Sequence, residues 1–137
     1  MKNTKFDRQK TLSEIINRFK QQGIEKIILF DLMVKGNVTE DSDIDLVIIT
    51  DSDKLFESFE ERLKEKIKFR NLILDLSKTT PIDLLFFTKA EFKVLSEQQP
   101  LFINELKING RVLYEKNADY FYYKESNTRV ECFLTKT

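Results

Sequence analysis

The sequence predicts a single α/β (α+β) domain, residues 1–137, in which helices cover a small mixed central sheet of about four strands. Three observations predict this class. A length of 137 residues fits one domain with one core. A hydrophobic content of 41% with 34% charged residues is typical of a folded globular chain. Short runs rich in β-branched residues alternate with apolar residues at helical spacing, in the order α-β-loop-β-α-β-α-β. The core is expected over about residues 10–115, followed by an aromatic tail, 117–137.

The N-terminal third predicts a helix and two strands. "KIILF" at 26–30 and "DIDLVIIT" at 43–50 are short apolar runs of the kind that form strands buried on both faces. A polar connection joins them, and Gly23 is expected to end the helix before them. The helix is marked by apolar residues at i, i+3, i+4 and i+7: Leu12, Ile15, Ile16 and Phe19.

Residues 51–71 predict a second helix, and the segment 72–80 is interpreted as its continuation up to Pro81. One of Asp51, Ser52 or Asp53 is expected to cap the N-terminus, since short polar side chains accept hydrogen bonds from free backbone N–H groups. The inner face is predicted from its apolar residues: Phe56, Phe59, Leu63 and Ile67.

The remaining elements follow from local signals. "PIDLLFF" at 81–87 predicts a third strand, and "TKAE" at 88–91 is a capping box that starts a helix. Pro100 interrupts this helix and can begin a second helical piece. Gly110 ends that piece, and "RVLYE" at 111–115 predicts a fourth strand.

Composition excludes several kinds of chemistry. The chain has no histidine and one cysteine, Cys132, which rules out a Ser-His-Asp triad, a Cys-His pair and an intrachain disulfide. Carboxylates, Lys, Tyr or Ser must then carry any reaction, and oxygen-only ligands favour Mg²⁺ or Mn²⁺. The 23 basic and 23 acidic residues cancel, which argues against a broad grip on nucleic acid or membrane. No apolar signal segment or spanning run is present, so a cytoplasmic protein is expected.

Three aspartates are the candidate catalytic and metal-binding residues. Asp43 and Asp45 lie two residues apart, which in a strand places both side chains on one face. Two such anions repel each other unless a cation is present. Asp83 begins the third predicted strand in the same setting. If that strand pairs beside the second, the three carboxylates form a magnesium site at one edge of the sheet. The alternative is that these acids simply form a polar turn at a strand start.

The segment "IILFDLMVKGNVTEDSDIDLVIIT", 27–50, resembles the signature of the minimal nucleotidyltransferases, the MNT branch of the DNA polymerase beta-like superfamily. The family pattern is a strand, Gly-Ser, about ten residues, Asp-x-Asp on the next strand, and a third Asp on a later strand. Asp43, Asp45 and Asp83 match its metal-binding catalytic positions. The resemblance covers about residues 10–115 and implies a polymerase-beta-like nucleotidyltransferase fold.

The phosphate-binding half departs from that pattern. Asp31 and Leu32 stand where the family has Gly and Ser, which adds a negative charge and removes a hydroxyl where a nucleotide's phosphates are expected. Three readings are open: an active enzyme that binds its nucleotide differently, a pseudoenzyme that binds a partner, or a sequence altered deliberately at these two residues. The residues expected at the nucleotide are Asp31, Leu32, Lys35, Gly36 and Ser42.

The resemblance implies transfer of AMP from ATP, with Mg²⁺, to a hydroxyl. Many MNT proteins are antitoxins that modify a tyrosine of a HEPN-type toxin, and such a toxin is the expected partner. Homo-oligomerisation is left open. The alternative is a catalytically impaired relative that neutralises or scaffolds its partner by binding alone. The tail residues 120–123, "YFYY", suit an interface or the domain's own core; the core is favoured because small domains need all the apolar area they can bury.

Overall fold

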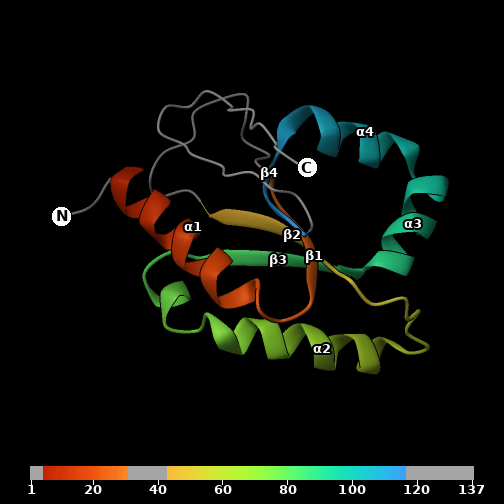
Figure 1. The fold of residues 1–137 in the computed structure, drawn as a ribbon, viewed down its shortest axis with the longest axis horizontal. Helices are drawn as coiled ribbons and strands as arrows, with labels where there is room; N and C mark the ends of the chain where they lie inside the picture. Colours follow the sequence, from red (N-terminus) through yellow and green to blue (C-terminus); the bar gives the residue numbers. More distant parts are fainter. Residues whose placement is uncertain (1–4, 31–42, 117–137) are drawn as a thin grey trace.

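The computed structural model describes residues 5–30 and 43–116, with side-chain burial from residue 8 onward. Figure 1 shows a four-stranded sheet with helices on both sides, which confirms the predicted class. The elements follow the order α1 (Lys5–Phe19), β1 (Ile24–Phe30), β2 (Ile44–Thr50), α2 (Phe59–Leu72), a short 3₁₀ helix (Leu76–Lys78), β3 (Ile82–Thr88), α3 (Lys89–Gln98), α4 (Pro100–Asn109) and β4 (Gly110–Glu115).

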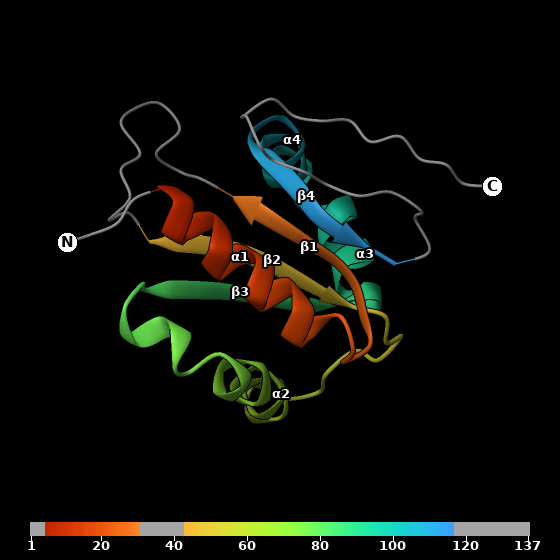
Figure 2. The ribbon, with the colours of Figure 1, turned by 60° about the vertical axis from the view of Figure 1, so that its left-hand side comes forward.

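The sheet has the strand order β3-β2-β1-β4, which can be followed in Figure 2. β1 runs antiparallel to both of its neighbours, β2 and β4, whereas β2 and β3 are parallel. The C-terminal end of β1 therefore shares one sheet edge with the starts of β2 and β3. The opposite edge holds the start of β1 and the ends of β2 and β3.

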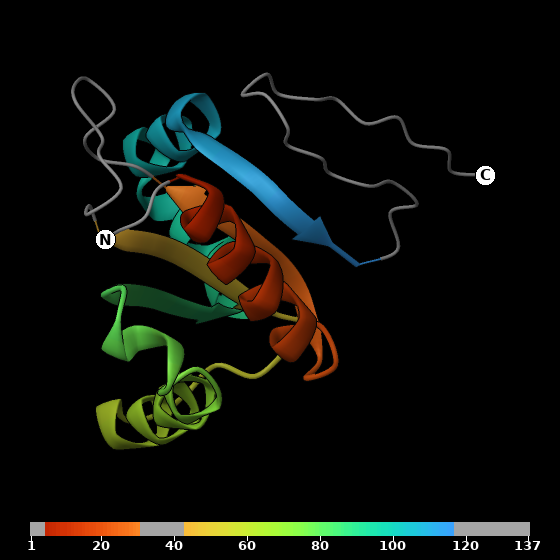
Figure 3. The same ribbon diagram turned by 90° about the vertical axis from the view of Figure 1, so that its left-hand side faces the viewer.

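Two apolar layers cover the two faces of this sheet. Figure 3 shows the helices behind them, with α1 and α2 on one side of the sheet and α3 and α4 on the other. Buried residues of the first layer come from both helices and three strands, and include Ile15, Phe19, Ile27, Ile48, Phe69 and Phe86. The second layer includes Ile28, Phe30, Val47, Ile49 and Leu106. Strands covered on both faces explain why their sequences read as continuous apolar runs.

Most local predictions are confirmed. The stripe of α1 buries Ile15 and Phe19 completely, and all four strands form where the apolar runs predict them. In the capping box, the Glu91 N–H donates to Thr88 Oγ1 at 3.0 Å and the Thr88 N–H donates to Glu91 Oε1 at 3.2 Å. Pro100 begins α4. Gly23, at φ 76°, shapes the turn before β1 rather than ending α1 directly.

Among residues 5–30 and 43–116, every helix falls short of the length and apolarity that crossing a membrane requires.

The predicted start of α2 is wrong. The helix begins at Phe59, and Ser58 caps it by accepting the N–H of Glu61. The three candidate caps at 51–53 lie in an irregular segment instead. That segment is held at the end of the sheet, because Ser52 O accepts the Lys89 N–H at 3.2 Å and Lys54 O accepts the Thr88 hydroxyl at 2.7 Å. These two hydrogen bonds hold the segment against the junction between β3 and α3.

The predicted inner face of α2 is wrong for three of its four residues, since only Phe56, which lies before the helix, packs half-buried against the core. Phe59, Leu63 and Ile67 are exposed, and Phe59 keeps 73% of its surface accessible. The helix instead buries the side that carries Phe69, and the chain just beyond it buries Ile73. The segment 72–80 does not continue the helix: α2 ends at Leu72, and a 3₁₀ helix follows at Leu76–Lys78.

Gly110 joins α4 to β4 at a point of close approach. A Cβ atom there would lie 2.5 Å from Leu106 O and 2.8 Å from Ile28 Cγ2. Because Leu106 O belongs to the helix backbone, the strand must shift to admit a methyl group. We expect Gly110→Ala to lower the free energy of unfolding by about 1–3 kcal/mol, measured by urea denaturation. Lys107→Ala, at an exposed position of α4, serves as the control and is expected to stay within about 0.5 kcal/mol of the native chain.

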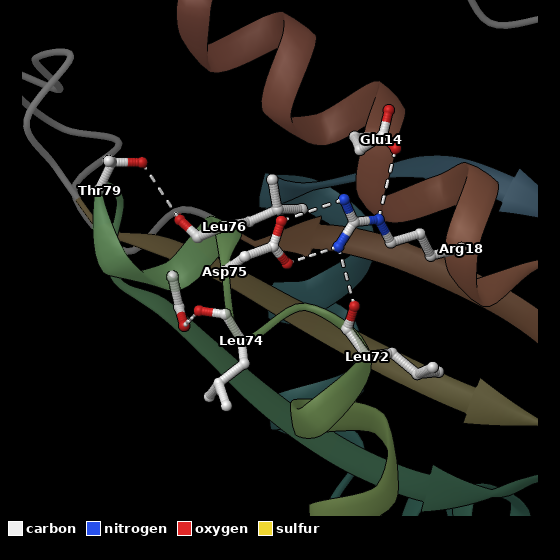
Figure 4. Close-up of polar contacts among 8 residues, drawn as sticks. Glu14, Arg18, Leu72, Leu74, Asp75, Leu76 and Thr79 are labelled. Carbon is white, nitrogen blue, oxygen red and sulfur yellow. Dashed lines mark hydrogen bonds and ion pairs between the residues drawn. The ribbon is translucent and has the colours of Figure 1, made fainter.

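Arg18 ties α1 to the chain beyond α2 (Figure 4). Its guanidinium donates to Leu72 O at 2.9 Å and to both carboxylate oxygens of Asp75, at 2.7 and 3.3 Å. The hydrogen bond from Arg18 lowers the pKa of the Asp75 carboxyl below its ordinary value. A lowered pKa in the folded state means that this stabilisation is complete above the ordinary carboxyl range and is lost as the pH falls through the lowered value.

Asp75→Asn is therefore expected to be less stable than the native chain at neutral pH, with the gap closing below about pH 4. Urea denaturation across this range measures the gap. Glu97→Gln removes one exposed carboxylate that makes no ion pair within the described residues, and controls for net charge. A stability difference between Asp75→Asn and the native chain that stays constant with pH would contradict a stabilising role for the Asp75 carboxylate beside Arg18.

Candidate active site

Asp45 of β2 and Asp83 of β3 lie directly side by side. The parallel ladder pairs Ile44 with Ile82, Asp45 with Asp83 and Leu46 with Leu84. Paired residues of neighbouring strands project to the same face of a sheet, so the two carboxylates share a face near the start of both strands. The condition set by the sequence, that the third strand pairs beside the second, is confirmed.

These two aspartates lie on the face that α3 and α4 cover only in part. Their neighbours Leu46 and Leu84 belong to the layer under α1 and α2, and alternation sends Asp45 and Asp83 to the other face. Further along that face, Val47 is fully buried in the second layer. Asp83 is exposed and Asp45 half-buried, and the next β3 residue on this face, Leu85, keeps 44% of its surface accessible. Within the described residues, the carboxylates occupy an open part of the sheet.

Phe30 provides an apolar wall beside Asp45. Leu29 pairs with Leu46, so the next residue of β1, Phe30, comes to the strand position next to Asp45. Phe30 is buried and meets Phe102 of α4 edge-to-face, with 6.5 Å between ring centroids. A low-dielectric wall strengthens the attraction between a carboxylate and a bound cation. Reasoning from the aspartates alone missed Phe30 and Leu85, although both lie in apolar runs that flank the motif.

Asp43 lies immediately before β2 and is exposed. The start of this strand is fixed to the start of its neighbour, because the Ile44 N–H donates to Pro81 O at 2.9 Å. Ile44, which lies between Asp43 and Asp45, is fully buried on the α1 and α2 side of the sheet. The backbone therefore brings all three predicted aspartates to one edge of the sheet.

The donor set suits a hard cation, since the three side chains offer only carboxylate oxygens. Among the described residues, no three His, Cys, Asp or Glu side chains are grouped so as to hold a metal ion. Magnesium binding by Asp43, Asp45 and Asp83 therefore stays a prediction.

The predicted nucleotide-binding residues lie outside the described residues, as do the tail and Cys132. These are Asp31, Leu32, Lys35, Gly36 and Ser42. Chain connectivity still places the two ends of their segment: it leaves from the end of β1 and returns at the start of β2. Both points belong to the edge that carries Asp45 and Asp83.

Comparison with known proteins shows the family to which this chain belongs. The model of the family described as polymerase beta, nucleotidyltransferase, matches residues 13–119, which include all three aspartates. No curated protein matches the chain. Among solved structures, a chain from the crystal structure of a mutant toxin-antitoxin MntA-HpeT is similar at 19% identity with a TM-score of 0.44, covering 77% of this chain and 72% of that one. On the family match, which spans most of its length, this chain belongs to the polymerase beta nucleotidyltransferase family.

Proposed function

We propose that the chain is an MNT-type antitoxin nucleotidyltransferase of the cytoplasm that transfers AMP from ATP to a tyrosine hydroxyl of a HEPN-type toxin. The observation that carries this proposal is the in-register pair Asp45 and Asp83 on an open sheet face, inside a segment that matches the nucleotidyltransferase family. The MNT-like spacing of Asp43, Asp45 and Asp83 supports the finer assignment.

In the proposed reaction, the acceptor oxygen attacks the α-phosphorus of ATP, the bond to the bridging oxygen breaks, and pyrophosphate leaves. Asp43 and Asp45 would hold Mg²⁺, which neutralises charge on the phosphates when bound. Asp83 lies beside Asp45 and is exposed, so its carboxylate can take the proton from an acceptor that approaches along the sheet.

A protein acceptor fits this part of the sheet. Within the described residues, exposed Leu85 continues the face from Asp83, and it offers apolar area where a docked protein can exclude water. A tyrosine at the edge of such a partner can reach the carboxylates from the open side.

The alternative is a pseudo-nucleotidyltransferase that neutralises its partner by binding alone. Asp31 and Leu32 favour it, because the resembling family has Gly and Ser at those positions. A carboxylate next to a triphosphate opposes nucleotide binding by about 1 kcal/mol or more per charge pair at close range.

Intact-mass spectrometry of a HEPN-type toxin co-expressed with this chain separates the two functions. Added AMP with the native chain, and none with Asp45→Asn, supports transfer. Asp53→Asn makes the same chemical change at an exposed position beyond the far end of β2, and is expected to behave like the native chain. An unmodified toxin that co-purifies with native chain and Asp45→Asn alike would establish the binding-only alternative instead.

A further inference from the structure

A cavity of about 460 Å³ lies at the opposite end of β2 from the aspartates. It is built by five parts of the chain: the turn before β1 with Gly23, the end of β2 at Thr50, the segment that follows, the helix α2, and the end of β3 at Thr88. Its volume falls within the range of about 300–1,000 Å³ typical of small-molecule sites. Thr50 lies five positions after Asp45 in β2, or about 16 Å along the strand.

The topology of the sheet explains why a cavity forms here. After β2 the chain passes to α2 on one face of the sheet, and after β3 it passes to α3 on the other face. Connections that leave two adjacent parallel strands toward opposite faces leave a crevice between the strands' carboxyl ends. In open α/β sheets such a switch point is where ligands bind. Thr50 and Thr88, the last residues of β2 and β3, both line the cavity.

Thr50 carries a buried hydroxyl with an unmet hydrogen bond. Its side chain is only 8% exposed, and among the described residues its Oγ1 is the buried side-chain polar atom that lacks a partner. The hydroxyl of Thr88, at the same level of β3, donates to Lys54 O at 2.7 Å and accepts the Glu91 N–H at 3.0 Å. A buried hydroxyl left unpaired is destabilising. An occupant with an acceptor oxygen would supply the partner that Thr50 lacks.

The charges that line the cavity balance, but one of its lysines lies outside the ion pairs of the described residues. Three lysines and three acids line it, and most are already paired: Lys54 with Glu61 (2.7 Å), Lys68 with Glu65 (3.4 Å), and Asp51 with Lys116 (2.6 Å). Lys64 lines the cavity too, and within the described residues it makes no ion pair. Beside the hydrogen bond from Lys54, Lys64 also interacts with Glu61 through space and helps to lower the pKa of that carboxyl. Phe56 is half-buried and adds apolar area to the lining, beside the buried rings of Phe69 and Phe86.

We propose that this cavity is a second ligand site, separate from the aspartate edge, for a small organic oxyanion. The carboxylate or phosphate group lies toward Lys64 and the Thr50 hydroxyl, and the apolar body lies against the half-buried ring of Phe56. This site does not depend on nucleotidyl transfer, because none of its lining residues belongs to the edge that carries Asp45 and Asp83.

Nuclear magnetic resonance of the full, uniformly ¹⁵N-labelled chain titrated with phenyl phosphate tests the proposal. We expect saturable shifts of the Gly23, Thr50 and Lys64 amides, with smaller shifts for inorganic phosphate, which lacks the apolar body. Lys64→Gln is expected to weaken binding about fivefold. Lys66→Gln, on the same helix but outside the cavity lining, is expected to leave binding unchanged.

Thr50→Val separates recognition from folding, since valine keeps the shape and removes the hydroxyl. We expect it to weaken phenyl phosphate binding while its melting temperature stays equal to or above that of the native chain. Asp45→Asn is expected to bind phenyl phosphate normally. Shifts that gather at the start of β2 and vanish in Asp45→Asn would place the anion at the aspartate edge and overturn the proposal. So would the absence of saturable shifts at low-millimolar probe.

Discussion

Phe69→Ala is expected to lower the free energy of unfolding by about 3–5 kcal/mol. Phe69 is the buried centre of the layer under α1 and α2, with 2% of its surface exposed. Its ring meets Phe19 of α1 edge-to-face at 5.2 Å and Phe86 of β3 at 5.3 Å. Truncation therefore leaves a cavity where two helices and the sheet converge. Urea denaturation followed by circular dichroism measures the change.

The matched control is the same substitution at Phe59, nearly three turns earlier on the same helix. Phe59 is exposed, so Phe59→Ala is expected to change the free energy of unfolding by no more than about 0.5 kcal/mol. Equal losses for Phe59→Ala and Phe69→Ala would show that α2 packs through the face that the sequence pattern first indicated.

Substitution of Asp45 or Asp83 by asparagine is expected to slow the proposed AMP transfer at least about a hundredfold. Loss of a side chain that merely supports a metal ligand already costs about 10–100-fold, and both aspartates are proposed to act directly. Because they lie side by side and are proposed to act as a unit, the double variant is expected to be no slower than the slower single variant. Initial rates of AMP incorporation into the purified toxin measure this.

Two controls accompany these rates. Circular dichroism must show that each variant is folded, and Asp53→Asn must transfer AMP at the native rate. Effects of Asp45→Asn and Asp83→Asn that multiply in the double variant would contradict a shared site. They would mean that the two carboxylates serve independent steps.

Elements that depend on adjacent residues could be predicted from the sequence. The capping box of Thr88 and Glu91 forms within one helical turn. Pro100 begins α4 and Gly110 ends it, so both residues act at their own positions in the chain. The strands were predictable because both of their faces are buried. The three aspartates could also be named from the sequence as a candidate site, because they stand close together at the starts of apolar strands; their binding of magnesium stays a prediction.

Features decided by distant contacts could not be predicted. α2 carries two apolar groupings on different sides, one at 59, 63 and 67 and one at 69 and 72, and only the packing of Phe69 against Phe19 and Phe86 selects between them. The irregular segment before the helix is held by hydrogen bonds from Thr88 to Lys54 O and from Lys89 to Ser52 O, both contacts between residues distant in the sequence. The sequence likewise shows aspartates at two strand starts, but not that these strands are neighbours in register. No sequence motif marks the cavity beyond Thr50, because its lining comes from five parts of the chain that only the fold brings together.

The uninterrupted ladder between β2 and β3 also has a consequence for how defective copies of the protein would fare in a cell. A slip of one residue would turn Asp83 into the apolar layer and turn Leu84 and Phe86 outward. A chain misaligned for the proposed catalysis would thus also expose apolar side chains of the kind that chaperones and proteases recognise. Quality control that removes molecules with exposed apolar surface would therefore also remove the misaligned ones. The molecules that remain would be enriched in copies whose two carboxylates are correctly aligned.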